Sequence, residues 1–297
     1  MLVGGSPPEQ LAITHRDDGG TEEVEFFGDH GLLFGCRHVP AGPVRAGLVV
    51  CPPILADFGA NYQREVRLGR QLAAAGIVVQ RFHPRGAGQS DGEGVDLTLD
   101  SMIEDTRAAV TRLRDRFPVD TVAVMGTRFG ALAAVTVAAE LGGAPVVLWE
   151  PTTEPRRYFR EGLRARSVHQ FKAGTGVTAG AAGPGEAEDP AAELARCGYI
   201  DLLGARVGGQ LFHTPGDRDL ATLMGLRPRP VLLLQLDQRD ELRDEYRDLV
   251  DRWTAQGFAV TARCCPSEET WWFVHDRLTP VAAILDTTTD WLVARLP

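Results

Sequence analysis

A five-residue stretch, Gly126-Thr127-Arg128-Phe129-Gly130, lies where a chain could present a reactive side chain. An apolar, β-branched run ends in this stretch and an alanine-rich helical pattern follows it, which predicts a sharp strand-to-helix turn. Turns of this Gly-x-X-x-Gly type are nucleophile elbows, and their central residue is ordinarily serine. Here the central residue is Arg128, whose guanidinium stays protonated in proteins and cannot attack a substrate.

Two roles are open for Arg128. The turn places it at a helix N-terminus, which favours anions, so its guanidinium could bind a carboxylate or phosphate of a ligand through two hydrogen bonds. Alternatively, Arg128 pairs with Asp240 or Glu150 and fills a site that has lost its activity. In either case Arg128 is a candidate site residue and not the attacking group.

Asp240 and His275 form a candidate acid–base pair near the end of the chain. Asp240 follows the apolar run 231–236, and His275 lies in "WWFVHDRL", beyond the last apolar run. A histidine oriented by a carboxylate can act as a general base on water without a covalent intermediate. The alternative is that both residues are retained from an active ancestor and have no catalytic role. Glu150, directly after the run 145–149, is a second candidate for the acid.

Four further positions complete the candidate site. The Thr127 hydroxyl comes one residue before the centre of the turn, and Cys51 ends an apolar run. Each could be a nucleophile, or each could be a buried side chain with a structural role only. The backbone N–H of Phe129, directly after the elbow centre, is a candidate oxyanion donor. Since the two prolines after Cys51 lack an N–H, the second donor would come from Ile54 or later.

Composition excludes several classes of function. The chain has 297 residues and a formal net charge of -9, which argues against binding to nucleic acids or to anionic membranes. No apolar run approaches the roughly 20 residues of a membrane span. Residues 1–10 lack the basic region and apolar core of a signal peptide, so we expect a cytoplasmic protein. A small-molecule ligand is the expected partner, and a homo-oligomer is left open.

Neither a metal nor a cofactor is expected. The seven histidines show no metal-ligand spacing, and the five cysteines form no Cys-x-x-Cys pairs. No Gly-x-Gly-x-x-Gly motif follows a strand, which argues against a dinucleotide.

Strand and helix patterns alternate along most of the chain, which predicts a mostly parallel sheet covered by helices on both faces. Strands are expected at 24–27, 32–38, 46–51, 77–82, 121–125, 145–149, 231–236 and 258–264. Helices are expected at 62–75, 97–117, 129–141, 240–256 and 280–296. We divide the chain into a loose segment (1–20), a core (21–151 and 229–297) and an inserted helical cap (152–228).

These motifs, in this order, resemble the α/β-hydrolase superfamily. The stretches that carry the resemblance are "VVCPPI", "QRFHPRGAGQSDG", "GTRFG", "LQLDQRDEL" and "WWFVHDRL". The chain order Arg128, Asp240, His275 matches the superfamily's order of nucleophile, acid and base. His83 departs from the pattern, because the superfamily has aspartate there.

The chain is more narrowly similar to the exosortase A system-associated hydrolase 2 group, through "LVVCPP", the elbow arginine and "VVLWEPTTEPRRYF". The resemblance implies an α/β-hydrolase fold and hydrolysis of an ester, thioester or amide bond of a small acyl or acidic metabolite. The alternative is a non-catalytic relative that binds a ligand or a partner protein.

Overall fold

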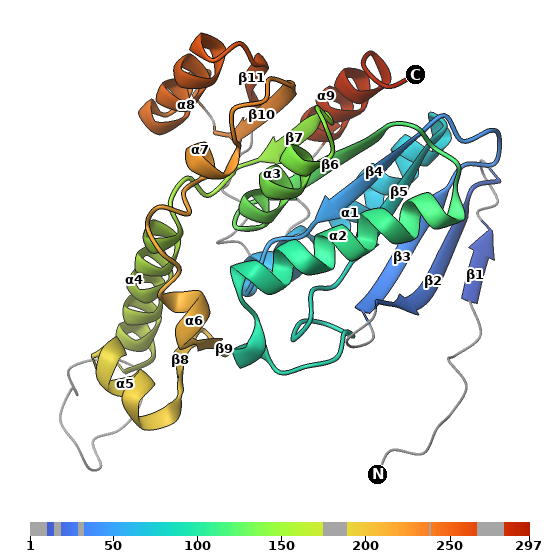
Figure 1. Ribbon diagram of the computed structural model, residues 1–297. Coiled ribbons are helices and arrows are strands. Elements are labelled where there is room, and N and C mark those ends of the chain that lie inside the picture. The colour runs from blue at the N-terminus through green and yellow to red at the C-terminus, as the bar shows by residue number, and fades with distance from the viewer. Residues whose placement is uncertain (1–10, 15–18, 29–32, 175–188, 238, 266–281) are drawn as a thin grey trace.

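The computed structural model describes residues 11–14, 19–28, 33–174, 189–237, 239–265 and 282–297 (Figure 1). Within these ranges one large sheet contains the strands β1 (Leu11–Thr14), β2 (Thr21–Phe27), β3 (Leu33–Val39), β4 (Ala46–Cys51), β5 (Ile77–Phe82), β6 (Val122–Thr127), β7 (Val146–Trp149), β10 (Pro230–Leu236) and β11 (Ala259–Cys265). Their spatial order is β1-β2-β3-β5-β4-β6-β7-β10-β11. The pairs from β5 to β11 are parallel, and the first three strands are antiparallel to their neighbours, which confirms the mostly parallel sheet.

Helices cover both faces of this sheet. Those next to the sheet are α1 (Ala56–Ala74), α2 (Leu99–Arg116), α3 (Gly130–Glu140), α8 (Asp244–Ala255) and α9 (Ala282–Val293), with a short 3₁₀ turn, η1 (Gly94–Asp96). Apolar side chains of α2, α3 and α8 belong to one buried cluster, and those of α1 and α9 belong to a second cluster behind the sheet (Figure 1). Every residue of β4, β5 and β6 is buried because both faces are covered.

A segment between β7 and β10 interrupts the alternation of strand and helix, and we call it the insertion (152–228). Its elements are α4 (Pro155–Gly174), α5 (Pro190–Cys197), the antiparallel hairpin β8 (Tyr199–Leu202) and β9 (Ala205–Gly208), α6 (Gly209–Phe212) and α7 (Leu220–Leu223). Figure 1 shows α4, α5 and α6 extending away from the sheet. Phe159 on α4 packs against Phe129 at the start of α3, with ring centroids 5.6 Å apart, and so ties the insertion to the core.

Several elements differ from the sequence-based expectation: α8 begins at Asp244 rather than at 240, and the hairpin of β8 and β9 was not expected. Leu11–Thr14 forms an edge strand on β2, although we expected residues 1–20 to be loose. Helix α1 begins at Ala56, six residues before the expected start at 62. Its early buried positions are Asp57 and Asn61, so the first turns face the core with polar side chains that apolar periodicity does not count.

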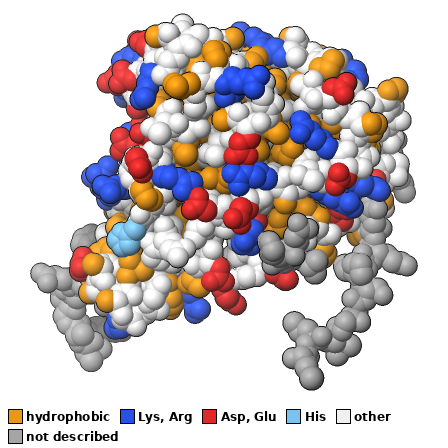
Figure 2. All heavy atoms as spheres, viewed as in Figure 1, with side chains coloured by type: hydrophobic (Ala, Val, Ile, Leu, Met, Phe, Trp, Pro, Cys, Tyr) orange, Lys and Arg blue, Asp and Glu red, His pale blue; other side chains and the backbone are white. Residues whose placement is uncertain are grey.

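Among the described residues, no helix has the length and hydropathy required to cross a membrane. The face shown in Figure 2 carries acidic and basic side chains interspersed with apolar ones.

Candidate functional site

The backbone at Arg128 is that of an elbow. Arg128 has φ 51°, a left-handed conformation that is uncommon for a residue with a side chain. Its N–H donates to the Trp149 carbonyl at 3.0 Å, and its carbonyl accepts from the N–H groups of Ala131 (3.2 Å) and Thr152 (3.0 Å). These hydrogen bonds hold the turn between β6, α3 and the end of β7, so the strained conformation is determined by its surroundings.

Close packing explains the two glycines of the elbow. A Cβ on Gly126 would lie 2.5 Å from the Ala131 Cα, and a Cβ on Gly130 would lie 2.3 Å from the Pro52 carbonyl oxygen. Both neighbours are backbone atoms and cannot rotate away. The elbow therefore keeps the steric requirements of the motif although its central side chain is arginine.

Backbone strain is concentrated at one edge of the sheet. Of the four described non-glycine residues with positive φ, three follow adjacent strands: Leu55 after β4, Arg128 after β6 and Glu150 after β7. Strained residues of this kind cluster at functional sites. In parallel α/β sheets, ligands bind at the carboxyl ends of the strands, which is this edge.

Arg128 is 8% exposed, and its side chain lies among polar groups of α1 and α4. Its Nε donates to the Asp57 carboxylate at 3.2 Å, and Glu161 lies 3.6 Å from another guanidinium nitrogen. The Tyr158 hydroxyl donates to the same Asp57 oxygen at 3.0 Å and lies 3.1 Å from the Ile54 carbonyl. The guanidinium carbon also lies 5.6 Å from the centre of the Tyr158 ring.

Asp57 and Arg128 form a buried ion pair. Burial raises the pKa of Asp57, and the nearby Arg128 charge and hydrogen bonds oppose that rise. Burial lowers the pKa of Arg128, but the interactions with Asp57, Tyr158, Tyr246 and Glu150 together outweigh it, so the pKa stays above its ordinary value. Arg128 is therefore a permanent cation, and among the described residues its closest acidic partner comes from the start of α1 rather than from Asp240 or Glu150.

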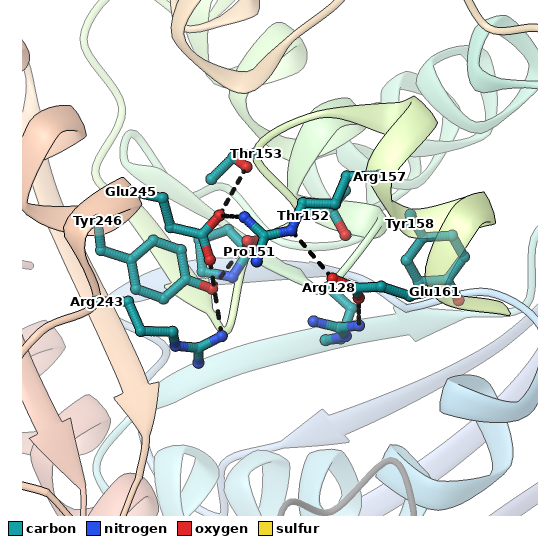
Figure 3. Close-up of a pocket in the computed structure, with 10 residues that line it drawn as sticks. All are labelled: Arg128, Pro151, Thr152, Thr153, Arg157, Tyr158, Glu161, Arg243, Glu245 and Tyr246. Carbon is teal, nitrogen blue, oxygen red and sulfur yellow. Dashed lines mark hydrogen bonds and ion pairs between the residues drawn. The ribbon is translucent and has the colours of Figure 1, made fainter. Parts of the chain in front are cut away.

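Arg128 lines a pocket of about 190 Å³ between α4 and α8, which we call the elbow pocket (Figure 3). Its walls are Arg128, Pro151, Thr152, Thr153, Arg157, Tyr158, Glu161, Arg243, Glu245 and Tyr246. Figure 3 shows Tyr158 and Glu161 projecting from α4 on one side, and Glu245 and Tyr246 from α8 on the other. The lining contains three arginines and two glutamates, so it has one more cation than anion.

Each arginine of the elbow pocket has a carboxylate partner. Arg157 donates to Glu161 at 3.0 Å and also forms an ion pair with Glu245. Arg243 forms an ion pair with Glu150. The cations are thus held in fixed positions, and only a ligand with its own hydrogen-bonding groups could compete for them.

Glu150, the second acid candidate, is fully buried and connects two strands. Its carboxylate accepts from the Leu236 N–H at the end of β10 and from Arg243, and the Tyr246 hydroxyl lies 3.4 Å away. Burial raises the pKa of Glu150, while Arg243 opposes the rise. These contacts fix the carboxylate behind the pocket wall.

The proposed acid–base pair is described only in part. Asp240 lies exposed in the loop between β10 and α8, and it is not one of the residues that line the elbow pocket. His275 lies outside the described residues.

The remaining candidates are buried at the base of the elbow. Thr127 and Phe129 are completely buried, Ile54 is nearly so, and the Thr127 hydroxyl has no hydrogen-bond partner among the described residues. Burial raises the pKa of the Cys51 thiol to about 12, although the Thr106 hydroxyl, 3.4 Å from the sulfur, opposes the rise. A thiol with this pKa is protonated near neutral pH and is a poor nucleophile.

Sequence reasoning missed Asp57, Tyr158 and Glu161. The signals for them are an acidic residue just after "VVCPPIL" and a tyrosine within the basic run "EPRRYF". Neither signal says which face of its helix turns toward the elbow.

One family model matches part of the chain. Residues 53–179 match the family described as serine aminopeptidase, S33, which is less than half of the 297 residues but includes the elbow. No curated protein matches the chain.

Solved structures match nearly its whole length. Est1E from Butyrivibrio proteoclasticus, with ferulic acid bound, is 15% identical with a TM-score of 0.60, over 91% of this chain and 98% of that one. An esterase from Pyrococcus furiosus is 17% identical with a TM-score of 0.60, over 98% and 94%. An α/β serine hydrolase without lid from Xanthomonas campestris is 20% identical with a TM-score of 0.53, over 98% and 97%. At these identities the likeness concerns the fold.

Proposed function

We propose that this chain, which has the α/β-hydrolase fold, is a hydrolase that cleaves an ester, thioester or amide bond of a small anionic metabolite. The observation that carries the proposal is the intact elbow backbone, which presents the Arg128 cation to a pocket at the carboxyl ends of the strands. An arginine in the nucleophile's place binds rather than attacks. Water is therefore the attacking group in this proposal.

The elbow pocket limits the substrate's size and polarity. Its volume of about 190 Å³ is below the roughly 300–1,000 Å³ of typical small-molecule sites, so it suits a small group. Arginine, glutamate, threonine and tyrosine side chains dominate its walls, which suits a polar group better than a long acyl chain. A second hollow of about 390 Å³ shares Arg157, Arg243 and Glu245 with it and is also lined mainly by charged side chains.

In the proposed reaction, Arg128 binds a carboxylate or phosphate of the substrate. A guanidinium has five N–H donors in a planar fork, so it can bind Asp57 and a ligand at the same time. His275, oriented by Asp240, takes a proton from water while the water oxygen bonds to the substrate carbonyl carbon. The backbone N–H groups of Phe129 and Ile54 stabilise the resulting oxyanion. The bond to the leaving group then breaks, and His275 returns the proton to that group.

The insertion supplies one wall of the pocket, through Arg157, Tyr158 and Glu161. This contribution supports the interpretation of residues 152–228 as a cap over the site. The narrower resemblance to the exosortase A system-associated hydrolase 2 group is part of the same proposal.

The second candidate function is non-catalytic binding of a ligand or a partner. The observation that favours it is the contact of Arg128 with Asp57, together with the bond from Tyr158 to the same carboxylate. This network occupies the space between the elbow and the loop after β4, where an oxyanion would form.

One panel of assays separates the two functions. Hydrolysis of short aryl esters and acyl-thioesters, with and without a free carboxylate, is measured for wild type, His275→Ala, Asp240→Asn and Arg128→Lys. His169→Ala is the matched control, because His169 is exposed on α4. We expect wild-type turnover to favour the carboxylate-bearing esters. We expect turnover by His275→Ala to be at least about 100-fold lower than that of wild type.

Arg128→Ser extends the panel. If wild type shows no turnover and activity appears only in Arg128→Ser, the hydrolase proposal is wrong and the chain is a binder. Turnover that persists in His275→Ala would reject the water mechanism.

A further inference from the structure

Helix α4 lines a second pocket with a different side from the one that lines the elbow pocket. This outer pocket of about 330 Å³ is lined by Arg156, Phe159, Arg160, Phe212 and His213. Positions 156, 159 and 160 share one side of a helix, while the elbow-pocket positions 157, 158 and 161 share the other. The two pockets are thus separated by the width of α4, and their lining residues do not overlap.

The charge of the outer pocket is entirely basic. Its lining includes two arginines and a histidine but no carboxylate. Among the described residues, neither Arg156 nor Arg160 forms an ion pair, whereas Arg157 between them contacts both Glu161 and Glu245. Two guanidinium groups one helical turn apart, without a built-in counter-ion, are suited to a shared anion.

The floor of the outer pocket is aromatic and fixed. Phe159 is 2% exposed and packs on Phe129 at 5.6 Å and on Phe212 at 5.5 Å between ring centroids. Phe212 is half-buried and lies 5.1 Å from the His213 ring. Rings that are held on one side by the core present an apolar surface whose geometry does not depend on a ligand.

We infer that the outer pocket is a second ligand site, which takes a small amphiphilic anion. Its aromatic or short alkyl body lies against Phe212, which Phe159 supports from the core side, and its carboxylate or phosphate lies between Arg156 and Arg160. The volume is in the range of small-molecule sites, and the mixture of an apolar floor with a few placed polar groups is their usual composition. This site is independent of the proposed hydrolysis, because it shares no residue with the elbow pocket.

Titration calorimetry on the full chain tests the inference with phenyl phosphate and 4-phenylbutyrate as probes. Benzyl alcohol, which has the ring but no charge, is the third probe. We expect both anions to bind wild type and benzyl alcohol to bind at least about tenfold more weakly. Binding of the anions should weaken with added salt.

Variants locate the site. The double variant Arg156→Gln with Arg160→Gln should bind both anions at least about tenfold more weakly, since two charge-assisted hydrogen-bonding groups are lost. Arg164→Gln, at an exposed position of the same helix that lines neither pocket, should leave binding unchanged.

Two results would overturn the inference: no binding to wild type, or equal binding to the double variant. The second result would place the anion outside the outer pocket. Equal affinity for benzyl alcohol would mean that the arginines do not contribute.

Discussion

The two sides of α4 use the same residue type in opposite ways. On the elbow side, Arg157 is matched by Glu161 and Glu245, and Arg128 behind it by Asp57. On the outer side, Arg156 and Arg160 have no carboxylate partner among the described residues and lie beside phenylalanine rings. A guanidinium that is already paired fixes the geometry of its surroundings, whereas an unpaired one can exchange water for an incoming anion.

The difference has an energetic consequence. Removing one partner of a buried pair leaves a charge without compensation, which destabilises the fold strongly. Removing an exposed cation from the outer pocket leaves no such charge. Stability measurements should therefore separate the two sides of α4.

Gly130→Ala should have the largest effect, because the added Cβ would meet two backbone carbonyl oxygens at 2.3 and 2.6 Å. We expect the free energy of unfolding to fall by about 3 kcal/mol or more, at the upper end of overpacking substitutions. Urea unfolding followed by circular dichroism measures this change. Gly216→Ala is the control near the outer pocket, since its Cβ would lie 3.7 Å from the Arg156 side chain. Equal stability of the two variants would show that the elbow is not tightly built.

Asp57→Ala should lower the free energy of unfolding by about 3 kcal/mol, because it leaves the buried Arg128 without its closest carboxylate. The same urea titration measures it. The double variant Asp57→Leu with Arg128→Met removes both charges and should recover most of the loss. If the double variant were as unstable as Asp57→Ala, packing rather than charge would explain the effect.

Glu65 on α1 provides a comparison within one helix, because it is buried but less well paired than Asp57. Burial raises its pKa to about 7 from 4.5, although Arg81 at 3.7 Å and a hydrogen bond from Asn61 oppose the rise. The folded state keeps the proton longer than the unfolded state, so stability falls as pH rises from about 4.5 to 7.

This contribution amounts to about 2 kcal/mol between pH 5 and pH 7. Glu65→Gln should remove that part of the pH dependence, which urea unfolding at several pH values would show. An unchanged pH profile in Glu65→Gln would mean that Glu65 ionises normally in the folded protein.

Arg156→Gln with Arg160→Gln should have the smallest effect on folding, within about 0.5 kcal/mol of wild type, because both side chains are exposed. Thermal unfolding with and without phenyl phosphate would measure this. We expect the ligand to stabilise wild type more than the variant. A large intrinsic loss of stability would mean that these arginines support the fold.

Much of the fold could be predicted from the sequence, because its central strands are short β-branched runs between turn residues. The strand expected at 46–51 coincides with β4, and the elbow at Gly126 to Gly130 lies where its glycines indicate. The start of α1 could not be predicted, because Asp57 and Asn61 face the core there. Periodicity detects buried positions only when they are apolar.

The candidate site was predictable in position but not in its contacts. The unusual residue at the elbow identified Arg128, yet its partner Asp57 is 71 residues earlier in the chain. That pairing depends on where the start of α1 lies relative to the elbow, which no local pattern records. The roles of Asp240 and His275 stay predictions, since loop geometry decides whether such side chains meet.

The contact between Phe129 and Phe159 has a consequence for how relatives of this chain can diverge. Phe129 follows the elbow arginine and Phe159 forms the floor of the outer pocket, so a change in ring size at one position alters the space available to the other. Substitutions at these two positions should therefore be correlated among homologues. Homologues that have a small residue at position 129 or 159 should carry a compensating change at the other of these two positions. This should hold even where the charged residues of either pocket differ.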